Sequence, residues 1–397
     1  MNTAVWVLGW GIALTGCGGR ALTDASGSPA AGMGGATGVS TPAGVAGASA
    51  GCASCISSGG SSVAVTQLAT ATSATALAVD ANNVYWIDNS PATTGTLASV
   101  KRCAISGCGG KPTTVWQTPD DLFFLAVAGD SLWWADIVLN AIDDPASIVS
   151  CPVAGCGATT VLANLGGTTL QAFAASAAGV VWATDSGTFT CSLAGCSGGV
   201  PTQLFTASGS EAGYVIQNSR LFGINLYVDG GEDFAQTNHL FSCSVSGCMS
   251  DPAVLGTVNA SGPLALDAEN AYWVYPGTSS VAFSGLPIPM NSWTDGAIYE
   301  CPLSGCVGDP TALMNYPSWY RPTSIAADAS GVYWTVGVPG ADMSSLVRCS
   351  GAGCGMDPTV LATLSASTTP AIALDAENVY WIDQGLGAIM MRAKNPP

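Results

Sequence analysis

The sequence predicts an all-β protein, a seven-bladed β-propeller of four-stranded antiparallel blades, and two repeats along the chain support this prediction. One repeat is a hairpin of two apolar strands around a polar turn, and the other is a pair of cysteines with four residues between them. The two repeats alternate along the chain at intervals of about 40 to 60 residues, which is the period of one propeller blade. We therefore expect one propeller domain over residues 62–397.

The hairpin repeat occurs seven times. In each copy a short apolar strand leads into a polar turn and then an aromatic strand, as in "AVDANNVYWID" from Ala78. A polar turn between two such strands is typical of a tight β-hairpin. The other copies begin at Ala126, Ala174, Val215, Ala265, Ala326 and Ala373.

The cysteine repeat occurs six times, with Gly before the second cysteine, as in "CAISGC". A four-residue hairpin loop brings its flanking residues to about 5.5 Å between Cα atoms, which suits a disulfide. Zinc is the weaker alternative, because zinc sites bring closer C-x-x-C pairs together. We expect six local disulfides: Cys103 with Cys108, Cys151 with Cys156, Cys191 with Cys196, Cys243 with Cys248, Cys301 with Cys306, and Cys349 with Cys354.

The seventh unit ends in "GAIMMRAKNPP" without a cysteine hairpin or a fourth strand. Residues 62–71, "SVAVTQLATA", precede the first hairpin and are similar to the fourth strands of the other units. We expect this N-terminal strand to pair with the C-terminal blade and close the ring, which removes a free sheet edge.

The aromatic strands, for example "VYWID" in two of the copies, resemble those of the YWTD propellers of receptor ectodomains and of the TolB-like propellers. The resemblance covers about 330 residues and implies the fold. Its relatives usually have six blades, so the count of seven comes from this sequence alone.

A tryptophan occupies the same position in six hairpins, and Gly223 replaces it in the fourth. We expect these rings to pack between neighbouring blades, because blades bury both faces and aromatic side chains carry large burial energies. The alternative, a ligand-stacking column, needs exposed rings. The tryptophans are Trp86, Trp134, Trp182, Trp273, Trp334 and Trp381.

Four hairpin turns contain an aspartate: Asp80, Asp267, Asp328 and Asp375. Aspartate side chains commonly accept hydrogen bonds from nearby backbone N–H groups in turns. We expect them to cap the turns, with calcium binding as the alternative.

The N-terminus predicts export. Residues 3–14 are mostly apolar, too short to span a bilayer, and placed like the core of a signal peptide. "LTGC", ending at Cys17, resembles the lipobox of bacterial lipoproteins, which implies lipidation of Cys17; Gly18 in the next position implies the outer membrane, on its periplasmic or cell-surface side. An ordinary signal peptide is the alternative. The six expected disulfides likewise require an oxidising compartment.

Residues 1–16 are therefore assigned to a signal peptide and residues 17–61 to a lipidated cysteine with a tether rich in Gly, Ala and Ser. Such a composition cannot bury enough surface to offset its ordering entropy. "GASAG", residues 47–51, matches the nucleophile pattern of hydrolases but lacks the strand before it and the helix after it. Cys52 and Cys55 have redox-motif spacing without its βαβ context.

Charge restricts the partners. The chain has 26 acidic and 9 basic residues, a net charge of −17 and no basic cluster. Nucleic acid and anionic lipid surfaces are poor partners for such a chain. We expect contact with the membrane through the lipid anchor only, a monomer, and a protein, glycan or cationic ligand.

No catalytic constellation is recognisable. His239, the single histidine, is predicted to lie in a loop, and no nucleophile accompanies it. The sequence favours an envelope-anchored binding or scaffolding lipoprotein. The alternatives are a metal-dependent propeller enzyme, lactonase- or lyase-like, and a purely structural envelope component. Carboxylates at the mouth of the central channel would favour the enzyme, whereas a channel lined by Ala and Val would favour binding.

Long insertions follow the fourth and fifth hairpins, and "NYPSWYRP" leads into the sixth. We expect these loops on one face of the ring and the cysteine hairpins on the other. Functional loops on rigid scaffolds concentrate binding residues, and Trp and Tyr are common interface anchors. The predicted binding surface, with calcium as a candidate ligand of its acids, comprises Asp229, Glu232, Asp233, Trp293, Asp295, Trp319 and Tyr320. The alternative is that these loops only cover the channel mouth.

Overall fold

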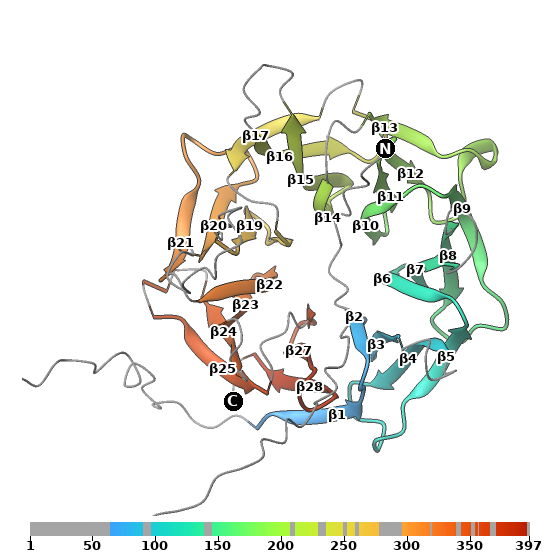
Figure 1. Ribbon diagram of the computed structural model, residues 1–397, viewed down its shortest axis with the longest axis horizontal. Helices are drawn as coiled ribbons and strands as arrows, with labels where there is room; N and C mark the ends of the chain where they lie inside the picture. The colour runs from blue at the N-terminus through green and yellow to red at the C-terminus, as the bar shows by residue number, and fades with distance from the viewer. Residues whose placement is uncertain are drawn as a thin grey trace, which may run out of the picture. The chain divides into compact units, whose positions relative to one another are not determined.

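The computed structural model contains seven four-stranded antiparallel sheets arranged as the blades of a propeller (Figure 1). The chain divides into units 1–60 and 61–397, and all residues that the structure describes belong to the second. The described residues are 64–89, 97–138, 145–206, 211–228, 236–248, 252–258, 262–277, 296–317, 320–338, 343–350, 354–355, 357–365 and 371–394. The prediction of a seven-bladed, all-β propeller is confirmed.

Each blade uses its four strands in the same order from the centre outwards (Figure 1). The first, innermost strands are β2 (Ala74–Val79), β6 (Asp121–Ala128), β10 (Leu170–Ser176), β14 (Glu211–Gln217), β18 (Leu264–Leu266), β22 (Arg321–Asp328) and β26 (Ile372–Leu374). The second strands are β3 (Asn83–Asp88), β7 (Ser131–Ile137), β11 (Gly179–Thr184), β15 (Arg220–Val228), β19 (Asn270–Tyr275), β23 (Gly331–Gly337) and β27 (Asn378–Asp383).

The third strands are β4 (Ala98–Ala104), β8 (Ala146–Pro152), β12 (Gly187–Cys191), β16 (Gln236–Ser244), β20 (Gly296–Pro302), β24 (Ser344–Cys349) and β28 (Ala388–Ala393). The fourth, outermost strands are β5 (Thr113–Thr118), β9 (Thr160–Gly166), β13 (Thr202–Phe205), β17 (Ala253–Val258), β21 (Thr311–Tyr316), β25 (Thr359–Leu364) and, in blade 7, β1 (Thr66–Thr70).

The ring closes through the N-terminal strand. β1 pairs antiparallel with β28, from Thr66 opposite Met391 to Thr70 opposite Ala388. The sheet order β1–β28–β27–β26 makes β1 the outer strand of the last blade. The predicted closure is therefore confirmed.

The six tryptophans of the second strands are at most 1% exposed, which confirms that they pack between blades. In blade 4 a side chain at Gly223 would collide with the rings of Tyr214 and Phe241, which lie 2.8 and 2.7 Å from where its Cβ would be. These two rings fill the space of the missing tryptophan and contact each other edge to face at 6.0 Å.

All six cysteine pairs form the predicted local disulfides, with Cα atoms 4.6 to 5.4 Å apart. The glycine before the second cysteine has a positive φ in five of these hairpins, for example 101° at Gly107 and 141° at Gly155. Glycine adopts this conformation without steric cost, which explains its recurrence. The bonded pairs, in the order of blades 1 to 6, are Cys103 with Cys108, Cys151 with Cys156, Cys191 with Cys196, Cys243 with Cys248, Cys301 with Cys306, and Cys349 with Cys354.

The disulfides also pack against the neighbouring blade, which the spacing did not predict. In blade 1 the sulfurs of Cys103 and Cys108 lie 3.7 and 3.6 Å from the carbonyl oxygen of Leu68, on the outer strand of blade 7. Cys196 of blade 3 similarly lies 3.5 Å from the carbonyl oxygen of Leu162 in blade 2. Each cystine thus belongs to the packing between its blade and the preceding one.

The second cysteine of each pair is less buried than the first. Cys156, Cys248, Cys306 and Cys354 are all partly buried, and each packs against the same apolar cluster as the first cysteine of its own pair. The first cysteine is the last or second-to-last residue of the third strand, whereas the second lies in the hairpin loop at the edge of the interface between the two blades, which we call a seam. The disulfide therefore ties this loop to the buried strand.

Blade 7 has no cystine, and basic side chains replace it. The Arg392 guanidinium donates to the carbonyl oxygen of Leu361, on the outer strand of blade 6. Lys394 is buried at 2% exposure and pairs with Asp328 of blade 6. The backbone N–H of Lys394 donates to the carbonyl oxygen of Glu377. The N–H of Ile105, in the first cysteine hairpin, donates in the same way to the carbonyl oxygen of Asn82, so the two segments occupy equivalent places in their blades.

Candidate functional site

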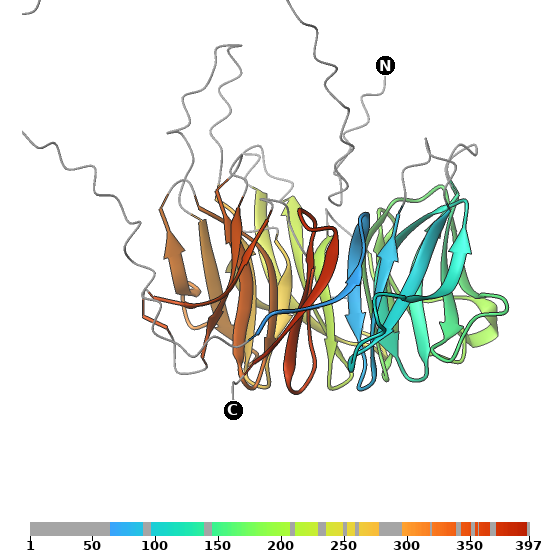
Figure 2. The ribbon, with the colours of Figure 1, turned by 90° about the horizontal axis from the view of Figure 1, so that it is seen from below.

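The propeller has two working faces. Figure 2 shows the sheets edge-on, with strands running between these faces. The antiparallel order places the loops between second and third strands, together with the connections between blades, on one face, which we call the loop face. The turns between first and second strands lie with the cysteine hairpins on the opposite face, which we call the hairpin face.

One residue of the predicted binding surface lies within the described residues. Tyr320, in the connection from blade 5 to blade 6, is 38% exposed, and its ring centroid lies 6.2 Å from that of Tyr316. Tyr316 in turn accepts a hydrogen bond of 2.7 Å from the buried indole of Trp334. Tyr320 is therefore a partly exposed ring that packs against Tyr316, whose position is fixed by its hydrogen bond with Trp334. The other predicted residues lie outside the described residues: Asp229, Glu232, Asp233, Trp293, Asp295 and Trp319.

Three carboxyl groups gather on the loop face of blade 2, which the sequence did not indicate. Asp120 and Asp121 lie at the start of the innermost strand β6, and Asp136 lies near the end of β7, opposite Leu122. Burial, followed by the charge and hydrogen bonding of Asp120, raises the pKa of Asp136 to about 6. Burial and Asp120 also raise the pKa of Asp121. Two carboxyl groups in contact cannot both ionise easily, so the pair of Asp120 and Asp136 holds a proton more readily than either group would alone.

Three other inner strands are mainly apolar, with "ATALAV" in β2, "LAL" in β18 and "IAL" in β26, whereas β14 and β22 begin with the charged residues Glu211 and Arg321. Apolar inner strands agree with the binding alternative, and the carboxyl pair agrees with the enzyme alternative. Among the described residues, no three His, Cys, Asp or Glu side chains converge as metal ligands.

His239 was predicted to lie in a loop, and this prediction is wrong. The residue is part of β16, opposite Asn225 on one side and Thr257 on the other, and it is partly buried. The long insertion before it hid the beginning of the strand, since its polar residues lack the apolar alternation of the other third strands.

The turn aspartates act as predicted. Asp80 Oδ1 accepts hydrogen bonds of 2.7 Å from the backbone N–H groups of Asn82 and Asn83. Asp267 and Asp375 cap their turns in the same way. The second oxygen of Asp80 accepts a hydrogen bond from the hydroxyl of Tyr85 at 2.8 Å, and burial together with this aspartate raises the pKa of Tyr85 to about 12. The carboxylate oxygens of Asp80, Asp267 and Asp375 thus already accept hydrogen bonds from groups of the protein.

Most basic side chains of the described region are used inside the fold. Lys101 pairs with the buried Asp88 at 2.5 Å, and Arg220 donates to Ser242. Arg102, Arg348, Arg392 and Lys394 bond groups of a neighbouring blade. The acidic residues Asp130, Asp185, Glu269, Asp309, Asp357 and Glu377 are by contrast exposed. The described surface is consequently dominated by negative charge.

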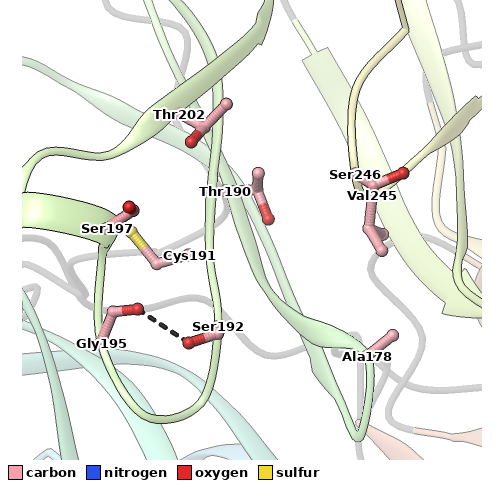
Figure 3. Close-up of a pocket in the computed structure, with 9 residues that line it drawn as sticks. All are labelled: Ala178, Thr190, Cys191, Ser192, Gly195, Ser197, Thr202, Val245 and Ser246. Atoms are coloured by element: carbon pink, nitrogen blue, oxygen red, sulfur yellow. Dashed lines mark hydrogen bonds between the residues drawn. The ribbon is translucent and has the colours of Figure 1, made fainter.

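A pocket of about 320 Å³ lies on the hairpin face between blades 3 and 4 (Figure 3). The cysteine hairpin of blade 3 forms one wall, with Thr190 and Ser192, and Val245 and Ser246 of the blade 4 hairpin form the facing wall. Ser192 is fixed by a 2.8 Å hydrogen bond to the carbonyl oxygen of Gly195. The lining carries hydroxyl groups and no charged side chain, unlike the acidic turns elsewhere on this face.

Solved structures share this fold. The tricorn protease is 12% identical with a TM-score of 0.54, and the match covers 83% of this chain but 34% of that protein. An oligogalacturonate lyase in complex with manganese is 12% identical with a TM-score of 0.50, over 74% of this chain and 83% of the lyase. The β-propeller domain of the Trilobed protease from Pyrococcus furiosus, which has an open velcro topology, is 6% identical with a TM-score of 0.50, over 83% and 97%.

These similarities show the fold alone, because the identities are low. No protein-family model matches the sequence, and no curated protein matches it. The class of the protein is therefore a seven-bladed β-propeller, here closed by its N-terminal strand. Among the described residues, no helix has the length and apolar character needed to cross a bilayer.

Proposed function

We propose that this protein is an exported binding or scaffolding lipoprotein, anchored in the outer membrane through Cys17, whose propeller recognises a polypeptide, glycan or cationic ligand with its loop face. The observation that carries the binding function is the distribution of charge. Basic groups are bound between blades while acidic groups remain exposed, mostly on the hairpin face, so the surface as a whole attracts cationic groups and repels nucleic acid. The loop face is proposed as the binding surface because the long insertions with Trp293 and Trp319 are expected there.

The export and anchoring part of the proposal rests on the "LTGC" sequence, supported by the six disulfides, which persist in oxidising compartments. Cys17→Ser should release the protein from the membrane fraction while its thermal unfolding stays unchanged. The matched control, Cys52→Ser with Cys55→Ser, should remain in the membrane fraction. Retention of Cys17→Ser in washed membranes would contradict the anchor.

The loop face is tested by affinity capture from an envelope extract. The double variant Trp293→Ala with Trp319→Ala should recover its partner at least tenfold less than the wild type, since aromatic anchors dominate interface energies. Leu386→Ala serves as control, because Leu386 is an apolar residue that is 56% exposed in the turn between the second and third strands of blade 7. Equal recovery by all three proteins would place the binding surface elsewhere.

A propeller enzyme, lactonase- or lyase-like, is the second candidate, because Asp120, Asp121 and Asp136 at the inner end of blade 2 include a carboxyl with a pKa of about 6, which suits acid–base catalysis. If this enzyme is metal-dependent, these carboxyls need further ligands, since the described residues contain no set of three that converges as metal ligands. Calcium or manganese should then raise the melting temperature of the wild type and not that of the double variant Asp120→Asn with Asp136→Asn. Equal melting temperatures with and without these ions would argue against a metal-dependent enzyme and leave binding as the remaining candidate function. A purely structural envelope role would be indicated if no partner is captured.

A further inference from the structure

The seams between blades repeat one pair of positions. On the second and third strands of each blade, two facing residues lie next to the cysteine hairpin of the following blade or, where blade 7 follows, next to the segment of Lys394 that takes its place. The pairs are Tyr85 with Arg102, Trp133 with Ser150, Val181 with Thr190, Phe222 with Ser242, Tyr272 with Glu300, Tyr333 with Arg348, and Tyr380 with Met391. Blade 3 is the exception, because both of its residues are small and neither is aromatic.

Arginine fills two of these seams. Between blades 1 and 2, Arg102 donates to the carbonyl oxygen of Val153 at 2.5 Å. Between blades 6 and 7, Arg348 donates to the carbonyl oxygen of Lys394 at 3.0 Å and to that of Ser330. Val153 and Lys394 occupy the same place in their blades, since the backbone N–H of each bonds the turn of its own blade, at Asp130 and Glu377.

The seam between blades 3 and 4 has the same backbone frame without the arginine. Val245 corresponds to Lys394, because its N–H bonds Ser219 in the turn of blade 4 at 3.1 Å. Ala178 corresponds to Ser330, since each precedes the glycine that begins the second strand. Thr190 replaces Arg348, and its hydroxyl donates instead to the carbonyl oxygen of Val180 at 3.1 Å.

Ala178, Thr190 and Val245 all line the pocket described above (Figure 3). The pocket therefore lies where the guanidinium group lies in the other two seams. We propose that it binds the guanidinium group of an arginine side chain presented by a peptide or protein partner.

The chemistry of the pocket suits this ligand. A guanidinium is planar, has five N–H donors and needs acceptors in its plane, which carbonyl and hydroxyl oxygens supply. Ser197, Thr202 and Ser246 add hydroxyl oxygens to the wall, and no lining residue is cationic. The net charge of −17 attracts such a ligand over longer distances. Lysine fits less well, because its ammonium is compact and strongly hydrated.

This site is on the hairpin face, opposite the surface of the proposed function, so either proposal can fail alone. The probe is N-acetyl-arginine N-methylamide, titrated into the full chain by calorimetry and followed by backbone amide NMR shifts. A single guanidinium should bind with a dissociation constant of roughly 1 mM. The lysine probe and the neutral citrulline probe should bind at least tenfold more weakly.

Thr190→Arg supplies the pocket with a guanidinium of the protein itself and should abolish binding of the probe. Thr160→Arg adds the same charge on the exposed outer strand of blade 2 and should leave binding unchanged. Melting temperatures show whether both variants fold. In the wild type, the amide shifts of Ser192 and Ser246 should change on titration, which tests the site without any variant.

Several results would overturn the proposal. Equal binding of the arginine and lysine probes would indicate general attraction to the acidic surface. Binding retained by folded Thr190→Arg, or shifts confined to other residues, would move the site. Binding of a neutral oligosaccharide such as maltotriose, but not of the arginine probe, would make the pocket a carbohydrate site.

Discussion

The seam between blades 3 and 4 and the seam between blades 6 and 7 share one backbone frame but differ in chemistry. In the first, a cystine and Val245 pack against the outer strand of the preceding blade, and a pocket remains beside Thr190. In the second, there is no cystine, Lys394 pairs with Asp328, and Arg348 fills the space. The Arg348 guanidinium also lies 5.5 Å from the ring centre of Tyr333, within the range of a cation–π contact.

The comparison shows that a repeated fold fixes where a side chain lies but not what it does there. The register of the second and third strands determines that position 190 in blade 3 and position 348 in blade 6 face the next blade. Arginine at this position joins two blades, whereas threonine leaves an open site. The closing blade, which joins the two ends of the propeller chain, uses ionic contacts where the other blades use a disulfide.

The largest effect is expected from removing β1, the strand that completes blade 7. Deleting residues 62–71 removes β1 and leaves β28 as an unpaired edge. The apolar side chains that pack against Leu68 and Ala69 become exposed to solvent. We expect aggregation or loss of cooperative unfolding, measured by calorimetry and size-exclusion chromatography. Deletion of residues 30–39, within the segment that the sequence predicts to be a tether, is the control, and this variant should unfold like the wild type. A folded monomer without β1 would contradict the observed closure.

The next largest effect concerns the ion pair itself. Lys394→Met keeps most of the side-chain volume but leaves Asp328 without its cationic partner, so the free energy of unfolding should fall by about 3 kcal/mol at neutral pH. Denaturant unfolding measures this change. Lys111→Met, on an exposed lysine, should change it by less than about 0.5 kcal/mol. Equal effects of the two substitutions would show that the pair does not hold the seam.

The pH dependence of this pair has a definite sign. Burial opposes ionisation of Asp328, but the donors Lys394 and Ser330 outweigh it and hold the pKa of the carboxyl below its usual value. The stability that this group contributes is therefore present above the unfolded-state pKa of about 3.9 and is lost as the pH falls through the lower folded-state pKa. The difference between wild type and Lys394→Met should shrink correspondingly below about pH 4.

A somewhat smaller effect is expected at the disulfide seam. Cys243→Ser together with Cys248→Ser removes the cystine of blade 4 that packs near Leu204 and Phe205 of blade 3. Because the closed loop is short, the loss should be about 2 kcal/mol. The control, Cys52→Ser with Cys55→Ser, should leave thermal unfolding unchanged. A loss greater than that of Lys394→Met would reverse the order of the two seams.

The smallest effect is expected on the loop face, away from both seams, where the pKa of Asp136 makes the stability of the protein depend on pH. The folded-state pKa of Asp136, about 6, lies above its unfolded value, so stability should fall as the pH rises from about 4 to 6. Asp136→Asn removes this dependence and should stabilise the protein at pH 7 by up to about 1 kcal/mol after allowance for solvent screening. Asp185→Asn, on an exposed turn of the same face, should have no such effect. Parallel stability profiles for wild type and Asp136→Asn would show that the carboxyl pair does not form.

The local features could be predicted because they depend on neighbours in sequence. The tight hairpin around Asp80 is encoded by a turn whose aspartate caps N–H groups two and three residues later. The disulfides follow from four intervening residues with a glycine, and the missing strand of the last unit pointed to residues 62–71. The strand position of His239 was not predicted, since a long polar insertion removed the apolar alternation on which the prediction depended.

The number of blades, the disulfide pairs, the burial of the tryptophans and the closing strand could all be predicted from the sequence, because each follows from a repeat or a short-range contact. Which groups meet across the seams depends on the three-dimensional packing: Arg102 contacts Val153, Arg348 contacts Lys394, and Thr190 faces the pocket beside Val245. These partners lie about one blade apart in sequence, and their contacts depend on how one twisted sheet stacks on the next. A pattern within one repeat contains no information about that stacking, so the pocket between blades 3 and 4 arises from the three-dimensional packing of the two sheets and not from any local motif.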